Sequence, residues 1–564
     1  MNTDPFLPLD RAISELTAHK DAWAVTSIDE RMQLLHEVRT GVMAQAGAWA
    51  AAAAAQKGIA PQSPLAGEEW ISGPYGVLMW CNAMLATLAH IKAGTHLAGL
   101  ATRSLPNGQL AARVMPASLY DRMLLSGVSA EVWMAPGVTA ANLGEHSAAA
   151  YRAPRPAGKV ALVLGAGNIA AIAPLDCLHK LYAEHEVVLL KMNPVNAYLM
   201  AFLAPALAPL IARGFLRIVS GDAAVGQYLC NHAGIDTIHI TGSGAAHDAI
   251  VWGAGALGAA NKLAGTPNNR RPISSELGGA SPTIVVPGPW SEADLRFQAE
   301  HVATQKMHNA GFNCIASQVL ITDAGWPQTQ RFVTLIGDVL AAASPRALYY
   351  PGSAQRLDGL TGASANPRER AGAIVPFAAG TGHWAEKVEV FGPLLGHTSL
   401  SAASAEAFLI AAIAYANDSL PGTLGANILI HPATMAQIGR ARFDAIIATL
   451  RYGTIAINAW TGLGFLLPAC TWGAFPGHRL DDVQSGIGQV HNALLFDRAE
   501  RSVIEAPFRP FPRALLSGQF TMLPRPPWFI TNRRARQLGE QLTRFEFRRS
   551  PAKLFGIFVN ALRG

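Results

Sequence analysis

The stretch Lys159-Val-Ala-Leu-Val-Leu-Gly-Ala-Gly-Asn-Ile-Ala170 decides the fold class of this chain. Residues 160–164 form a short, continuous apolar run, which is typical of a strand buried on both faces. A helix-like stretch follows the glycine-rich loop and ends near His185, and Val187-Val-Leu-Leu190 is a second apolar run. Strand, helix and strand in this order predict a parallel sheet and therefore an α/β fold.

Further short apolar runs extend this pattern along the chain. They lie at residues 216–219, 237–240, 283–286, 319–321 and 455–458. Their spacing leaves room for helices between most of them, and we expect a second α/β unit to begin around Pro272. The first 100 residues are helical in pattern, and the chain has no fixed-period repeat, which argues against a solenoid or a propeller.

The composition indicates a large globular protein. The chain has 564 residues, of which 50% are hydrophobic and 15% charged, enough for two to four folding units. Its beginning lacks the pattern of a secretory signal, and its five cysteines are widely spaced, so we expect a cytoplasmic protein without disulfides. The uncharged stretch 192–212 contains three prolines and is predicted to be a buried helix with its approach loop, not a membrane span.

The last 56 residues differ from the rest in charge. From Arg509 onward ten Arg and one Lys stand against two Glu, whereas the net charge of the whole chain is +6. Residues 533–547 have the pattern of a basic amphipathic helix, and aromatic segments flank them. Such a tail can contact an anionic membrane peripherally, or it can pack on the body of the protein or on a neighbouring subunit. Nucleic-acid binding is not expected, because no recognition motif accompanies the basic residues.

Three motifs carry the candidate chemistry. The loop Gly165-Ala-Gly-Asn-Ile-Ala170 follows a strand and opens a helix, as in dinucleotide-binding proteins. The second strand, however, ends in Lys191 and lacks the acidic residue of an ordinary Rossmann site. Glu276-Leu-Gly-Gly279 and Asn309-Ala-Gly-Phe-Asn-Cys314 then offer a carboxylate and a cysteine, the pair needed to form and hydrolyse a thioester.

With these motifs in this order, the chain resembles the aldehyde dehydrogenase superfamily over residues 20–490. Later segments also match: Ala416-Asn-Asp418, Tyr452-Gly-Thr-Ile-Ala-Ile-Asn458 and Ser485-Gly-Ile-Gly488. The resemblance implies an aldehyde dehydrogenase-like fold, with a Rossmann-like cofactor domain, a second α/β catalytic domain and a small oligomerisation arm. The implied divisions are 1–271 for the NAD(P)-binding domain with its arm around 130–157, 272–484 for the catalytic domain, 485–508 for a return strand and oligomerisation segment, and 509–564 for a basic, aromatic-rich extension.

The resemblance also implies roles for individual residues. Cys314 is similar to the family's nucleophile, Glu276 to its water-activating base, and Asn168 to the amide that holds the oxyanion. The implied cofactor-binding residues are Gly165, Ala166, Gly167, Lys191, Gly242, Ser243, Leu277, Glu389 and Phe391. The implied reaction oxidises an aldehyde to a carboxylic acid through a thiohemiacetal and a thioester on Cys314. No metal is proposed, because the histidines lack metal-ligand spacing.

Several features leave alternatives open. The family usually has a glutamate where Pro194 stands; its loss makes NADP more plausible and leaves the choice between NAD and NADP open. Apolar residues near the motifs, Phe312, Trp460 and Phe465, favour a hydrophobic aldehyde. A CoA-acylating aldehyde dehydrogenase or acyl-CoA reductase is the enzymatic alternative, which the presence of Glu276 disfavours, and a catalytically silent oligomeric homologue is the other. The resemblance implies a homodimer or homotetramer.

Overall fold

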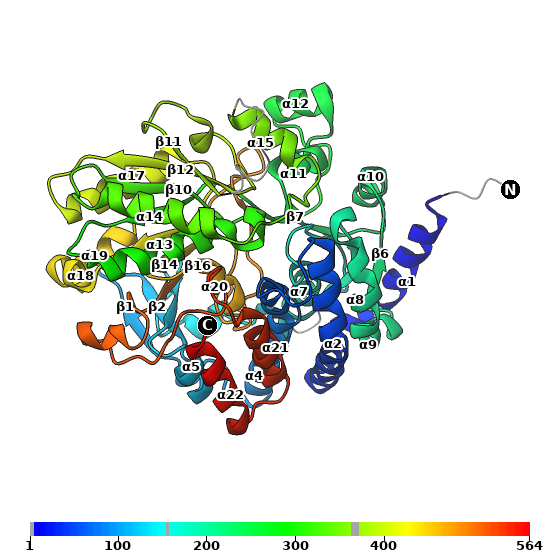
Figure 1. Ribbon diagram of the computed structural model, residues 1–564. Coiled ribbons are helices and arrows are strands. Elements are labelled where there is room, and N and C mark those ends of the chain that lie inside the picture. Colours follow the sequence, from blue (N-terminus) through cyan, green and yellow to red (C-terminus); the bar gives the residue numbers. More distant parts are fainter. Residues whose placement is uncertain (1–4, 154–156, 362–371) are drawn as a thin grey trace.

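Two β-sheets organise the computed structural model, which describes residues 5–153, 157–361 and 372–564 (Figure 1). The smaller sheet has the strand order β15-β8-β7-β4-β5-β6, and only β15 runs antiparallel to its neighbour. Its strands are β4 (Val160–Leu164), β5 (Val187–Lys191), β6 (Leu216–Val219), β7 (Thr237–Gly242), β8 (Ile273–Leu277) and β15 (Gly486–Ile487). The prediction of an α/β fold with a parallel sheet is thus confirmed.

The larger sheet has ten strands in the order β1-β2-β3-β16-β14-β13-β9-β10-β12-β11. The run from β16 to β11 is parallel, and β1, β2 and β3 continue it as an antiparallel meander. The strands are β1 (Thr102–Ser104), β2 (Leu110–Met115), β3 (Ser129–Met134), β9 (Ser281–Val285), β10 (Ser317–Asp323), β11 (Ala373–Pro376), β12 (Leu394–Leu400), β13 (Gly425–Leu429), β14 (Thr454–Ile457) and β16 (Ala499–Glu505).

Helices cover both sheets. Those before β8 are α1 (Leu7–Ala24), α2 (Ile28–Gln56), α3 (Ala66–Trp70), η1 (Ile71–Tyr75), α4 (Gly76–Lys92), α5 (Leu119–Leu124), η2 (Leu143–His146), α6 (Ala149–Arg152), α7 (Ile172–Tyr182), η3 (Pro194–Leu199), α8 (Met200–Ala206), α9 (Ala208–Ala212), α10 (Ala223–Asn231), α11 (Gly244–Val251) and α12 (Gly255–Ala264). Those after it are α13 (Glu292–Met307), η4 (His308–Gly311), α14 (Thr329–Ala342), α15 (Ser353–Thr361), η5 (Trp384–Glu386), α17 (Ala405–Ser419), α18 (Pro432–Ile438), α19 (Arg440–Ile447), α20 (Gly462–Leu466), η6 (Arg513–Ser517), α21 (Ala535–Phe547) and α22 (Pro551–Leu562).

The stretch 192–212, predicted as one buried helix with its approach loop, forms three short helices instead. η3, α8 and α9 follow one another, and the chain departs from helical geometry at Leu207 between α8 and α9. Pro209 lies in the first turn of α9, where its missing N–H breaks no helical bond, so the proline starts a new helix. Within the described ranges, no helix combines the length and the apolar composition that crossing a bilayer requires.

The predicted arm and the predicted return segment each contribute one strand, β3 and β16, to the ten-stranded sheet of their own chain. β3 pairs antiparallel with β16, and β16 pairs parallel with β14. β8 lies just beyond the boundary predicted at residue 271 but belongs to the smaller sheet. The domain divisions and the role of the arm in oligomerisation therefore stay predictions.

The C-terminal extension packs on the body of the protein. α21 runs against α3 so closely that a Cβ on Gly67 would lie 2.3 Å from the carbonyl carbon of Ala535. Arg509 and Arg513 both form ion pairs with the buried Asp294, and Asn82 of α4 donates to the Glu546 carboxylate. Figure 1 shows α21 and α22, in red, beside α4 and α5. The sequence left open whether the extension contacts a membrane or packs on protein. In the described structure it packs on the body of its own chain.

Candidate active site

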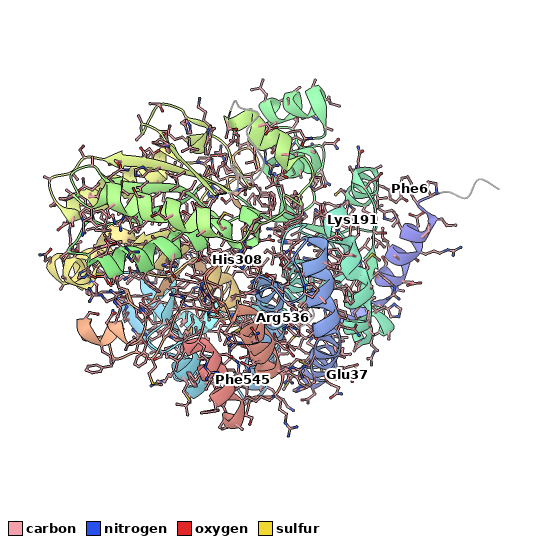
Figure 2. The ribbon with its side chains drawn as sticks, in the orientation of Figure 1. Phe6, Glu37, Lys191, His308, Arg536 and Phe545 are labelled. Carbon is pink, nitrogen blue, oxygen red and sulfur yellow. The ribbon has the colours of Figure 1, made fainter. Side chains whose placement is uncertain are left out.

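A cavity of about 730 Å³ opens at the carboxyl ends of β4, β5 and β7. This is the edge at which parallel sheets bind ligands. Eleven of the twelve residues proposed from the sequence line it: Gly165, Ala166, Gly167, Asn168, Lys191, Gly242, Ser243, Glu276, Cys314, Glu389 and Phe391. Leu277 does not, because its side chain is buried in the core and its N–H donates to the Ser485 carbonyl. Figure 2 shows Lys191 toward the smaller sheet and His308 near the centre of the molecule.

Cys314 lies in the loop between η4 and β10, at the junction of two cavities. It lines the large cavity and also a narrow apolar cavity on its other side. Burial raises the pKa of the thiol well above its usual value, and the charges of Glu276 and Glu389 raise it further. The other four cysteines are free and buried. Cys314 is therefore the half-buried sulfur next to a carboxylate, and it needs a base to ionise.

Glu276 stands at the end of β8, opposite Cys314. Burial raises its pKa to about 7, although interaction with the Cys314 thiol lowers it in part. An acid with a pKa near neutrality can both accept and release a proton at physiological pH. The Oε1 atoms of Glu276 and Glu389 are both buried and lack a hydrogen-bond partner among the described residues, which leaves them to a ligand or to water.

Glu389 reaches the same space from the loop before β12. A Cβ built on Gly278 would lie 1.8 Å from its Oε1, so this carboxylate can approach only because residue 278 is glycine. Burial raises the pKa of Glu389 to about 8, and the Glu276 charge adds to this, while Arg356 and Lys306 oppose it. Burial also lowers the pKa of Lys306 to about 7, and its Nζ donates to the Gly392 carbonyl at 2.9 Å.

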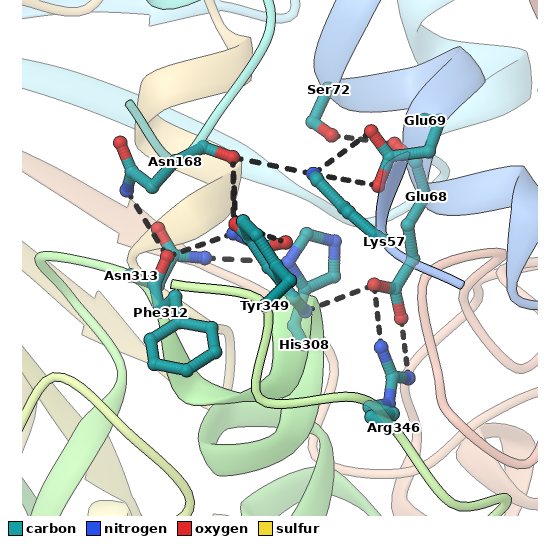
Figure 3. A network of polar contacts seen from close by, with 11 residues as sticks. Lys57, Glu68, Glu69, Ser72, Asn168, His308, Phe312, Asn313, Arg346 and Tyr349 are labelled. Carbon is teal, nitrogen blue, oxygen red and sulfur yellow. Dashed lines mark hydrogen bonds and ion pairs between the residues drawn. The ribbon is translucent and has the colours of Figure 1, made fainter. Parts of the chain in front are cut away.

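Asn168 is held by hydrogen bonds on both its side chain and its backbone (Figure 3). Its Nδ2 donates to the Phe312 carbonyl at 3.1 Å, which leaves the second N–H of the amide group for another acceptor. Its carbonyl accepts from Lys57 Nζ, Asn309 Nδ2 and the Tyr349 hydroxyl, each at 3.2 Å. The glycine loop is thereby tied directly to the loop that carries Cys314.

The turn before Cys314 is strained. Asn309, Ala310 and Gly311 have φ angles of 54°, 56° and 76°, a left-handed run that alanine rarely adopts. A Cβ on Gly311 would lie 2.5 Å from the Gly392 backbone. The Asn309 N–H donates to Glu68 Oε2 at 2.9 Å, so a side chain far away in sequence holds this turn in place.

Two buried ion pairs stand behind this turn (Figure 3). Arg346 binds Glu68 with two hydrogen bonds of 2.7 and 2.6 Å, and Lys57 binds Glu69 at 2.8 and 2.9 Å. Burial alone would raise the pKa of Glu68, but the charge and hydrogen bonds of Arg346 bring it down to about 2. The ionised Glu68 is therefore a fixed acceptor for the Asn309 N–H.

Breaking one of these pairs tests its role in holding the turn. We expect Arg346→Met to lower the free energy of unfolding by about 3–5 kcal/mol, because it leaves the Glu68 carboxylate buried without a counter-charge. Urea unfolding measures this loss. Arg331→Met is the matched control, since Arg331 pairs with Glu292 on the surface and its loss should change stability little. Equal losses for the two variants would contradict the assigned role.

Sequence reasoning missed several residues of the cavity wall. Arg356 donates to the carbonyls of Val390 and Phe391 at 3.1 and 2.7 Å and so holds the loop that carries Glu389. Tyr350 and Asp222 also line the cavity. None of the three belongs to a motif that the sequence displays, although Asp222 directly precedes a helix as an N-cap residue would.

The cavity has the features that a dinucleotide requires. A Cβ on Gly167 would lie 2.7 Å from the Tyr350 hydroxyl and 2.8 Å from the Asn193 side chain, so the loop stays open only with glycine. Gly244 begins α11 and faces open space, leaving the helix N-terminus accessible to a phosphate. Lys191 adds a positive charge, and although burial lowers its pKa, Asp222 opposes that shift. The chemistry of these donors suits a pyrophosphate and an adenosine ribose.

Residues 144–337 match the model of the aldehyde dehydrogenase family. This segment belongs to the aldehyde dehydrogenase family. The chain is also 27% identical over 161 residues to aldehyde dehydrogenase LUC3 of a Fusarium species, a match that spans 28% of this chain and 32% of that relative. The aldehyde dehydrogenase segment contains Asn168, Glu276 and Cys314, whereas Glu389 and Phe391 lie beyond it.

Solved structures extend the likeness over most of the chain. An NAD-dependent aldehyde dehydrogenase from Sinorhizobium meliloti superposes with a TM-score of 0.57 at 17% identity, covering 90% of this chain and 88% of that one. An aldehyde dehydrogenase C from Pseudomonas syringae, solved with NAD+ and octanal, gives 0.56 at 17% identity and 89% of each chain. An NADP-dependent glyceraldehyde-3-phosphate dehydrogenase from Bacillus halodurans gives 0.56 at 18% identity, covering 88% and 91%. The chain therefore has the aldehyde dehydrogenase fold.

Proposed function

We propose that this chain is an NAD(P)-dependent aldehyde dehydrogenase that oxidises an aldehyde to a carboxylic acid through a thioester on Cys314. One observation carries the proposal: Cys314, Glu276 and Asn168 face one cavity, which extends along the glycine loop to Lys191. A nucleophile, a base and an amide donor around one space are the groups that acyl chemistry at a carbonyl carbon needs. The family assignment of residues 144–337 supports the same reaction.

The nucleophilic step begins with a proton on Cys314. Both Cys314 and Glu276 have raised pKa values, so transfer of the thiol proton to Glu276 forms the thiolate without an added charge in the buried site. The sulfur then bonds to the aldehyde carbon, and the carbonyl electrons move to oxygen. The second amide N–H of Asn168 and the Cys314 backbone N–H would donate to that oxyanion.

Oxidation and release follow from the same residues. Bound NAD(P) supplies the hydride acceptor, and Lys191, Ser243, Glu389 and Phe391 would hold it. Loss of hydride from the thiohemiacetal carbon leaves the thioester. Glu276 releases to solvent the proton that it took from Cys314. It then takes a proton from water, and the resulting hydroxide bonds to the acyl carbon and expels the Cys314 thiolate, which recovers a proton from Glu276. The product is a carboxylic acid.

The acyl acceptor separates this proposal from its enzymatic alternative. Aldehyde-dependent formation of NAD(P)H should be the same with and without coenzyme A, because Glu276 activates water as the acceptor. Strict dependence on coenzyme A would favour an acylating enzyme or acyl-CoA reductase instead. If the protein neither binds NAD(P) nor forms a product with any aldehyde, the catalytically silent oligomeric homologue is the better account.

The choice between NAD and NADP depends on the carboxylate of Asp222. Sequence reasoning found no acid near Lys191, but Asp222 lines the same cavity and its charge acts on Lys191. We expect Asp222→Asn to lower KM for NADP about threefold relative to NAD, because it removes an exposed charge that repels the 2′-phosphate. Asparagine still caps α10. Steady-state kinetics with both cofactors measure the ratio of the KM values for NADP and NAD. The change that the substitution causes in this ratio should shrink at high salt.

Asp29→Asn is the control for Asp222→Asn. Asp29 is an exposed partner of Lys92 and does not line the described part of the cavity. Its loss removes the same formal charge elsewhere on the surface. An equal shift in both variants would mean that net charge, not the Asp222 carboxylate, sets the preference.

Assembly and location form a separate part of the proposal. A homodimer or homotetramer, a cytoplasmic location and peripheral membrane contact through residues 509–564 all remain predictions. The exposed side chains of Phe520, Met522 and Phe555 on the extension support a contact with another apolar surface. Light scattering would give the subunit number. Flotation with anionic vesicles would test the membrane contact.

A further inference from the structure

The apolar cavity that Cys314 also lines lies on the side of this residue away from the large cavity. Its wall is mostly aromatic and aliphatic and includes Ile315, Trp460, Phe465, Leu466, Trp472 and Trp528. Ser72, His308 and Asn313 are its polar members. Burial lowers the pKa of His308 to about 4, so its ring is neutral at pH 7 and no charge faces this space. The space is therefore suited to hydrocarbon attached to a group on the sulfur.

A third cavity adjoins the second. The two share four wall residues, Ile71, Leu463, Leu466 and Trp528, so they are separated by nothing thicker than these side chains. The far wall belongs to the C-terminal extension: Leu523, Leu538, Leu542, Ile557, Phe558 and Ala561. The catalytic body thus provides most of the wall next to Cys314, together with Trp528, and the extension, mainly α21 and α22, provides the far wall.

The charged residues at the far end already have partners. Glu546 accepts from Asn82 and pairs with Arg549, and Arg525 pairs with Glu300. Asp121 accepts the backbone N–H groups of Ala117 and Ser118. Because these charged groups already have partners within the protein, a ligand needs no polar group inside the third cavity.

The extension is fixed firmly enough to act as a wall. Phe545 packs edge-to-face on Tyr120 of α5 with ring centroids 5.2 Å apart, and Figure 2 shows it on the side of α21 that faces α5. A Cβ on Gly539 of α21 would lie 2.8 Å from Cβ of Trp70, so α21 and α3 touch through a glycine. An unbranched chain that enters from Cys314 would therefore meet a defined end.

We infer that residues 509–564 build the distal half of the acyl-binding channel, and that the substrate is a long, unbranched aliphatic aldehyde whose tail ends against α21 and α22. The inference rests on the proposed function, since it takes Cys314 as the site of the acyl group. It assigns the extension a direct role in specificity. Each additional methylene buried in such a channel should increase affinity about fourfold until the end wall is reached.

Filling the far end should shorten the accepted chain. Ala561→Trp places a large ring at the third cavity, and we expect kcat/KM for dodecanal to fall at least about tenfold while that for hexanal stays within about twofold. Ala561→Leu should give a smaller loss. Leu562→Trp is the matched control, because Leu562 is the next residue of α22 but is 61% exposed and does not line the cavity. Thermal unfolding of each variant checks that the extension still folds.

A binding measurement keeps the two proposals distinguishable. Calorimetric titration with dodecanoate and hexanoate needs no turnover. Wild-type protein should bind dodecanoate more tightly, and Ala561→Trp should lose that advantage. If hexanal is oxidised but Ala561→Trp changes neither the chain-length profile nor dodecanoate binding, the channel is wrong and the enzyme assignment stands. If no aldehyde is oxidised but dodecanoate binding depends on residue 561, the enzyme assignment fails and the apolar channel stands.

Discussion

Cys314→Ser should lower kcat for aldehyde oxidation by at least about 10⁴-fold, the scale of loss seen when an enzyme loses its nucleophile. A serine hydroxyl at this position is far less acidic than a thiol, and Glu276 would have to remove its proton in a buried site. NAD(P) binding should persist, because Lys191 and the N-terminus of α11 lie at the other end of the cavity. Single-turnover formation of NAD(P)H and a cofactor-binding titration measure the two effects.

Cys230→Ser is a demanding control for this result. Cys230 also lines the large cavity, but on α10 at the end near Lys191, and no carboxylate of the described residues faces its thiol as Glu276 faces that of Cys314. Burial raises the pKa of Cys230 to about 11, which keeps its thiol protonated. The variant should keep its activity within a few fold. Loss of activity in Cys230→Ser but not in Cys314→Ser would reassign the nucleophile.

Glu276→Gln is expected to slow turnover by about 10²–10³-fold at the hydrolytic step. The amide can accept a proton neither from Cys314 nor from water, so both acylation and hydrolysis should slow. Hydrolysis should slow more, because a thiol loses its proton to solvent far more readily than water does, and the acyl group should therefore remain on Cys314 after one round of oxidation. Rapid mixing should then show a burst of NAD(P)H close to one per chain, followed by a slow phase. In the wild type the slow step should accelerate as the pH rises through about 7, where Glu276 ionises, and this dependence should vanish in the variant.

Glu276→Gln should slow turnover but stabilise the folded protein at high pH. The pKa of Glu276 is raised in the folded state, so its protonated form contributes stability that is present below the ordinary pKa of 4.5 and is lost as the pH rises through about 7. Glutamine cannot ionise. The variant should therefore unfold at a higher temperature than the wild type at pH 8, and the difference should disappear near pH 4. A burst-free variant with wild-type turnover would contradict the role of Glu276.

The sequence was sufficient for the parts of the molecule that depend on local pattern. Continuous apolar runs predicted the parallel strands β4 to β7, because such strands are buried on both faces. The resemblance to the aldehyde dehydrogenase superfamily, not local pattern, implied that Asn168, Glu276 and Cys314 act together, and all three line the large cavity. Leu277 does not line this cavity, since a strand alternates its side chains and the one after Glu276 turns into the core, so its predicted contact with the cofactor stays a prediction.

Other features depend on contacts that no local pattern encodes. Glu68 and Arg346 are 278 positions apart. Lys57 donates to the Asn168 carbonyl, and the Tyr349 hydroxyl donates to Asn309 from another segment. From the sequence alone, each of these residues would be interpreted as a surface charge or as an aromatic residue of the core. The aromatic wall at Trp528 was equally hidden, because long-range packing of the extension on the body brings it to the far side of Cys314.

The most direct test of the account is to find the acyl group itself. Glu276→Gln protein mixed with NAD+ and hexanal, quenched in acid and digested, can be mapped by mass spectrometry. The account predicts one hexanoyl group per chain, on the peptide that contains Cys314. Absence of any acylated peptide, or acylation of another cysteine such as Cys230, would contradict it.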